Sequence, residues 1–141
     1  MSYYVFEGKN DYIAVYPALI ASFKASGSIA AGRAVSFDAG NTSEVYQAVV
    51  AKDSGSCVGI ALNTAADNKP TSVLVWGFAK NLTAESNYTP QPGDIICVSG
   101  SGLFTSIATG SYLKNPYCAV GKVVSGSTAG GVFMAFISCM K

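Results

Sequence analysis

The chain has 141 residues, of which 50% are hydrophobic and only 12% are charged, and its formal net charge is +1. A chain of this length forms one domain that buries about two thirds of its unfolded surface. The small charge, without any basic run or stripe, argues against nucleic acid as a partner. So few charges favour a surface that is partly buried against another protein over an ordinary Ser- and Thr-covered monomer surface.

The chain carries no feature of secretion or membrane insertion. The N-terminus lacks the basic start and apolar run of a signal peptide, and no stretch approaches the roughly 18 apolar residues of a membrane span. The four cysteines form no Cys-x-x-Cys pair and have no histidine to complete a zinc site; they are Cys57, Cys97, Cys118 and Cys139. Buried free thiols are favoured over disulfides or metal ligands, which indicates a reducing compartment.

In chain order, residues 3–16 come first and are rich in aromatic side chains around a polar turn at residues 8–11. This stretch is either a first hairpin packed on the core or an extended arm that lies on a neighbouring subunit, because aromatic residues supply much of the binding energy at interfaces. The candidate contact residues are Tyr3, Tyr4, Phe6, Tyr12 and Tyr16. Residues 17–27 fit a short helix or an extended strand, and the extended form is favoured because everything after it is β-like.

From residue 27 onward, short apolar runs alternate with Gly- and Ser-rich turns at a spacing of roughly 8–12 residues. The expected strands are residues 33–37, 45–50, 57–62, 71–80, 95–98, 103–107, 117–124 and 132–138. Those at 95–98 and 103–107 form a hairpin that we expect to organise the rest of the chain. No long 3.6-residue period exists, so helix is limited to a turn near residues 83–87 or 111–114. The sequence predicts one all-β domain, a small barrel or sandwich over residues 27–141, with residues 1–26 as a possible extended arm.

The chain offers few candidate catalytic groups. The chain has no histidine, and its carboxylates lie almost entirely in turn-like contexts, where Asp usually accepts hydrogen bonds from the local backbone. The glycines of residues 27–34 have the spacing of a phosphate-binding loop but lack its Lys and Ser/Thr. Trp76 and Phe78 fit a core or subunit interface better than a platform for a sugar or a base. A small hydrolase with clustered carboxylates is the weakest alternative. The sequence therefore predicts no enzyme, no cofactor and no metal site.

Five short motifs carry a resemblance: GRAV at 32–35, VGIAL at 58–62, VLVWG at 73–77, QPGDII at 91–96 with GLF at 102–104, and VGKVV at 120–124. Over roughly residues 27–125 their order resembles the head-decoration (cement) proteins of tailed bacteriophages, the phage lambda head-decoration family. The resemblance implies a β-tulip-like fold, a homotrimer on the threefold axes of a capsid, and an extended N-terminal segment in contact with the major capsid protein. It also implies a virion protein made in the host bacterial cytoplasm, without catalytic residues.

A different virion component remains open, such as a head-fibre base, a tail-tube-like module, or a carbohydrate- or host-attachment β-sandwich. A binding module of this kind keeps aromatic residues exposed on loops, for which Tyr88, Tyr112 and Tyr117 are candidates, whereas a cement protein buries them in the arm and between subunits. Two apolar runs, residues 73–78 and 132–137, would aggregate as open sheet edges. We therefore expect barrel closure or subunit pairing to cover them.

Overall fold

The computed structural model describes residues 14–41, 47–51, 56–107 and 119–139. These residues form an all-β structure without helices, which confirms the predicted fold class. The strands are β1 (Ala14–Ala25), β2 (Ala34–Phe37), β3 (Gln47–Val50), β4 (Cys57–Ala61), β5 (Pro70–Thr83), β6 (Ile95–Gly100), β7 (Leu103–Ser106), β8 (Gly121–Ser125) and β9 (Val132–Ser138). The extended form expected for residues 17–27 is confirmed as far as Ala25. Residues 83–87 contain no helical turn, and residues 111–114 lie outside the described part of the chain.

Among the described residues there is thus no helix with the length and apolar character needed to cross a membrane. Residues 14–25, part of the segment considered as a possible arm, form the first strand of the sheet. The rest of that segment, residues 1–13, lies outside the described residues.

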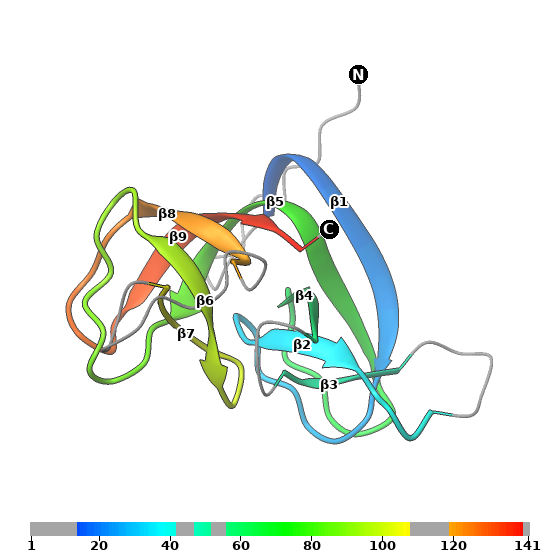
Figure 1. Ribbon diagram of the computed structural model, residues 1–141. Coiled ribbons are helices and arrows are strands. Elements are labelled where there is room, and N and C mark those ends of the chain that lie inside the picture. Colours follow the sequence, from blue (N-terminus) through cyan, green and yellow to red (C-terminus); the bar gives the residue numbers. More distant parts are fainter. Residues whose placement is uncertain (1–13, 42–46, 52–55, 108–118, 140–141) are drawn as a thin grey trace.

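Strand β5 is the element that the others are arranged around, rather than the expected hairpin. It pairs with β1 along one edge over residues 70–79, from Ala14 opposite Ala79 to Lys24 opposite Pro70. Its other edge is divided between β4 and β9, which pair with its first and second halves. A strand of 14 residues is long for a globular protein, and here its length lets it pair with strands of both parts of the same sheet. Figure 1 shows β5 passing from one half of the molecule to the other.

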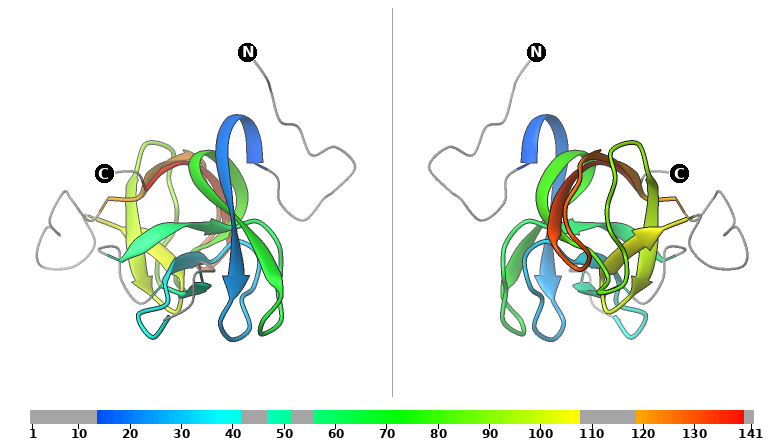
Figure 2. Two further views of the ribbon diagram at one scale, coloured as in Figure 1. Left: turned by 90° about the vertical axis from the view of Figure 1, so that its right-hand side faces the viewer. Right: turned by 90° about the vertical axis from the view of Figure 1, so that its left-hand side faces the viewer.

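The first half is a closed barrel. Strands β1, β3, β2, β4 and β5 follow one another in the sheet, and the pairing of β1 with β5 closes the ring. The β1–β3 pair is parallel and the other barrel pairs are antiparallel. Figure 2 shows β1 and β5 as the two long neighbouring strands of this barrel. Closure leaves the apolar first half of β5 without an open edge.

The second half continues from β5 in the order β9, β8, β6 and β7. It curls back toward the end of β5, where Ala84 forms a parallel bridge with Phe104 and the Glu85 N–H donates to the Phe104 carbonyl at 2.8 Å. Strand β9 pairs with β5 on one side and β8 on the other. Pairing within the chain therefore covers both apolar runs, as expected, except that Val132 and Phe133 pair with β5 and have no partner in β8.

The β6–β7 turn joins the two halves through the backbone. The Gly102 N–H donates to the Ala51 carbonyl at 2.9 Å, and the Gly102 carbonyl accepts from the Ala34 N–H at 3.0 Å. Beside it, Nη1 of Arg33 donates to the Ser101 carbonyl at 3.0 Å. Gly102 has a φ of 72°, and a Cβ built on it would lie 2.9 Å from the Ala34 carbonyl oxygen. Only glycine fits this left-handed and closely packed position.

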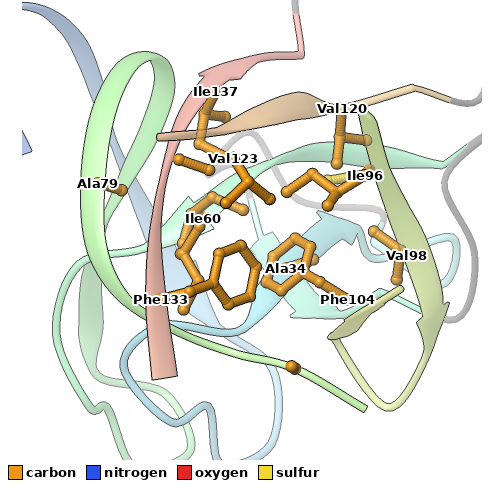
Figure 3. Packing of buried hydrophobic residues seen from close by; sticks show 14 of the residues in the cluster. Ala34, Ile60, Ala79, Ile96, Val98, Phe104, Val120, Val123, Phe133 and Ile137 are labelled. Carbon is orange, nitrogen blue, oxygen red and sulfur yellow. The ribbon is translucent and has the colours of Figure 1, made fainter. Parts of the chain in front are cut away.

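The main hydrophobic core lies between the two halves and receives side chains from both (Figure 3). Ile60 and Leu74 come from the barrel, whereas Phe104 and Phe133 come from the second half, where their rings pack edge to face with centroids 6.0 Å apart. A smaller cluster fills the barrel itself and includes Phe23, Ile29, Val35 and Val73. One hydrophobic core is thus shared by both halves.

Candidate interaction surface

One face of the sheet carries a continuous row of side chains across four strands. Ile95 of β6 pairs with Lys122 of β8, Lys122 pairs with Phe136 of β9, and Phe136 pairs with Phe78 of β5. Directly opposed residues in a sheet point to the same side, so these four side chains are neighbours. On β9 the intervening residues Phe133, Ala135 and Ile137 are buried, which places this row on the outside of the molecule.

Aromatic packing gives the centre of this face a fixed shape. The rings of Trp76 and Phe78 each meet the ring of Phe136 edge to face, with centroids 5.0 Å apart in both pairs. All three side chains are half-buried, so each keeps one part of its surface toward solvent. Edge-to-face pairs contribute about 0.5–1.5 kcal/mol each beyond the burial of area. The aromatic cluster is therefore a firm platform rather than a set of independent side chains.

Aliphatic residues surround this platform. Leu19 pairs with Trp76, and Val132 and Val124 lie on the same outer sides of β9 and β8. Together with Ile95, these aliphatic residues are 45 to 53% exposed. We use the term outer apolar face for Leu19, Trp76, Phe78, Ile95, Lys122, Val124, Val132, Met134 and Phe136.

The arrangement of these residues, more than their exposure, points to an interaction surface. Scattered apolar side chains are normal on protein surfaces, but contiguous apolar patches mark sites of association. Four of the five large hydrophobic residues that are well exposed in the described chain belong to the outer apolar face. The fifth, Phe37 of β2, packs on Phe23 with ring centroids 5.6 Å apart.

The sequence-predicted contact residues fall mostly outside the described chain. Tyr3, Tyr4, Phe6 and Tyr12 are not among the described residues, and Tyr16 lies in β1. Their role in contacts stays a prediction. The backbone nevertheless relates the two regions, because Val15 of β1 pairs with Phe78. The N-terminal end of β1 thus borders the outer apolar face, which sequence reasoning missed because the face depends on strand register.

The sequence suggests Tyr88 as an exposed aromatic of a binding loop, and the structure corrects this interpretation. Its side chain is only 5% exposed, and its hydroxyl donates to Oδ2 of Asp94 at 2.8 Å. The same oxygen accepts the Gln91 N–H at 3.1 Å. Burial, followed by the interaction with Asp94, raises the pKa of Tyr88 well above its usual value. Tyr88 and Asp94 therefore fix the turn before β6, while Tyr112 and Tyr117 lie outside the described residues.

Two further described aspartates accept hydrogen bonds from the backbone, Asp38 from its own turn, as expected, and Asp67 from a glycine 40 residues away. Oδ1 of Asp38 accepts the Gly40 N–H at 2.9 Å, and Oδ1 of Asp67 accepts the Gly27 N–H at 2.7 Å. Hydrogen bonds from the Ser26 side chain and then from Gly40 lower the pKa of Asp38. In the described ranges, no three His, Cys, Asp or Glu side chains come together in a way that suits a metal ion. Among the described residues, the outer apolar face is therefore the feature that suits contact with a partner.

No family model matches the chain, and no curated protein matches it. Two solved structures from bacteriophages are similar in fold. The head fibre gp8.5 N base of bacteriophage phi29 has 15% sequence identity and a TM-score of 0.61, and the match covers 87% of this chain and 96% of that one. A chain from the capsid of Myoviridae phage XM1 has 17% identity and a TM-score of 0.62, with 86% of this chain and 84% of that chain covered. At these identities the comparisons establish a shared fold.

Proposed function

We propose that the chain is a structural protein of a tailed-phage head that binds the outer surface of the capsid and stabilises the expanded shell. The observation that carries the proposal is the fold, which matches two phage head proteins over most of their lengths and of this chain. The sequence motifs independently resemble the head-decoration family. The protein acts as a homotrimer, without enzymatic activity, and its partner is the major capsid protein.

The outer apolar face supplies a physical basis for this binding. A rigid aromatic centre surrounded by exposed aliphatic residues is the composition of an interface core. Attachment that favours the expanded shell stabilises it by mass action, because every bound copy lowers the free energy of that state. Repetition over the many equivalent sites of a shell multiplies the effect without requiring high affinity at each site.

The binding test uses expanded shells that lack this protein. Purified full-length protein is mixed with the shells, and the bound amount is measured by co-sedimentation. We expect saturable binding by the wild type and at least a tenfold loss of affinity for Val132→Asp, which places a charge on the outer apolar face. Phe37→Asp is the matched control, because Phe37 is as exposed as Val132 but belongs to β2. Equal binding by both variants contradicts the assignment of this face.

The N-terminal segment requires a separate variant. Deletion of residues 1–13 leaves β1 intact and removes four of the five predicted aromatic contacts. We expect the truncated protein to unfold at the same denaturant concentration as the wild type but to bind shells more weakly. Sedimentation of both forms gives their oligomeric state. Unchanged binding by the truncated protein overturns the proposed role of the arm.

A head-fibre base is the second candidate, favoured by the match that covers 96% of the phi29 fibre-base chain. The two functions differ in what binding does to the shell. A decoration protein raises the temperature at which shells rupture, whereas a fibre base attaches to the head without this effect and carries a further fibre. Thermal rupture of shells with and without bound protein therefore decides between them.

A further inference from the structure

Two cysteine thiols that lie 82 residues apart in the sequence meet in the structure. The sulfur atoms of Cys57 and Cys139 are 3.6 Å apart. Cys57 opens β4, and Cys139 directly follows β9. These two strands occupy successive parts of the same edge of β5, so the sulfur contact spans the place where β5 passes from the barrel to the second half.

The backbone holds both cysteines in position. Cys57 belongs to the β4 ladder, in which it pairs with Ser36 of β2. The Cys139 N–H donates to the Val75 carbonyl of β5 at 3.0 Å. Both side chains pack against the main hydrophobic core. The sulfur contact therefore follows from the register of the strands.

We propose that Cys57 and Cys139 form a redox-controlled disulfide that locks the barrel to the second half of the molecule. Both side chains are thiols in the structure, which represents the reduced state. A disulfide bond is about 2.05 Å long, so the sulfurs have to approach by about 1.5 Å, a distance that small side-chain rotations supply. Cys139 is partly exposed and gives a soluble oxidant access to the pair, whereas Cys57 is buried.

The reaction with a small-molecule disulfide, such as oxidised glutathione, proceeds in two exchanges. The Cys139 thiolate attacks one sulfur of the oxidant and expels one glutathione thiolate, which leaves a mixed disulfide on Cys139. The Cys57 thiolate then attacks the Cys139 sulfur and expels the second glutathione. The two protons lost by the cysteines are taken up by the two glutathione thiolates. The protein thus loses two electrons, and these reduce oxidised glutathione to two glutathione thiols.

The disulfide closes a large loop, which determines the size of its effect. A link between residues 82 positions apart removes much conformational freedom from the unfolded chain. For a domain of this size we expect oxidation to raise Tm by about 10 °C, and dithiothreitol to reverse the shift. Reduced protein made in a cytosol therefore gains stability when it reaches an oxidising medium.

The test treats reduced full-length protein with oxidised glutathione and maps its disulfides by mass spectrometry under non-reducing conditions. We expect a peptide pair linked through Cys57 and Cys139, a loss of two alkylatable thiols, and the rise in Tm. Cys139→Ser is expected to lose the linked pair and the rise in Tm, and because Cys139 is partly exposed we expect the variant to fold. Cys97→Ala is the matched control. It removes a different buried thiol, in β6, and leaves Cys57 and Cys139 in place.

Three results overturn the proposal. One is the persistence of Cys57 and Cys139 as alkylatable thiols after oxidation. Another is a stable glutathione adduct on Cys139 without closure, and the third is a disulfide that involves Cys97 or Cys118 instead. The mapping is made on the wild-type protein, so its result does not depend on the folding of any variant.

Discussion

Replacement of Gly102 by alanine tests whether the β6–β7 turn holds the two halves together. Gly102 has a left-handed φ of 72° and exchanges backbone hydrogen bonds with Ala34 and Ala51. An added Cβ would lie 2.9 Å from the Ala34 carbonyl oxygen and 3.0 Å from Cγ1 of Val50. Gly93 provides a matched control, because its φ is 92° but a Cβ there would meet nothing within 4 Å.

The difference between the two variants isolates the effect of close packing. A left-handed φ costs an alanine roughly 1–2 kcal/mol at either position. At Gly102 the new methyl group also has to displace backbone and side-chain atoms, at about 2 kcal/mol, and weakens the joining hydrogen bonds by about 1 kcal/mol. We therefore expect Gly102→Ala to lower the free energy of unfolding by about 3 kcal/mol more than Gly93→Ala does.

Urea denaturation followed by tryptophan fluorescence measures this difference. Trp76 is the only tryptophan and its ring meets that of Phe136 in the second half edge to face, so its emission reports the loss of packing there. Both variants and the wild type are compared at the same pH and salt concentration. Equal destabilisation by the two substitutions would show that the approach of Gly102 to the barrel does not hold the halves together.

Three further predictions concern stability. Gly59→Ala places a Cβ 2.5 Å from the Leu74 carbonyl oxygen. In urea denaturation it should lower the free energy of unfolding by about 3 kcal/mol. A loss below about 1 kcal/mol contradicts the close packing of β4 on β5. Phe104→Ala leaves a cavity in the main core and should cost about 4 kcal/mol by the same measurement, whereas a near-neutral result would mean that the core collapses around it. The pKa of Tyr88 in the folded protein is raised above the unfolded value of 10.0. The stability that the protonated phenol contributes is therefore complete below that pH. It is lost as the pH rises toward the folded pKa, because the unfolded chain releases the proton first. Denaturation at increasing alkaline pH should thus show a shallower stability loss for Tyr88→Phe, and identical pH profiles would refute this role of the phenol.

Local patterns in the sequence predicted most of the strands, although β8 begins at Gly121 rather than at residue 117 and the first residues of β1 were left open between a hairpin and an arm. The run at residues 132–138 coincides with β9, and the run at 71–80 lies within the longer β5. Apolar residues in short runs between Gly- and Ser-rich turns favour strands wherever the chain finally places them. The scarcity of charge likewise indicated a contact surface, because composition does not depend on topology. The correction at Tyr88 has the opposite origin, since its burial depends on Asp94 and on the surrounding core.

The amino-acid sequence by itself thus determined the all-β class, the approximate strands and the lack of a recognisable catalytic motif. Only the tertiary structure decided that β5 belongs to both halves, that Ile95, Lys122, Phe136 and Phe78 form one row, and that Cys57 meets Cys139. The reason is register: side chains alternate between the faces of a strand, so a shift by one residue would move the entire row to the other side. Register is set by contacts between residues far apart in the chain, which local sequence patterns do not encode.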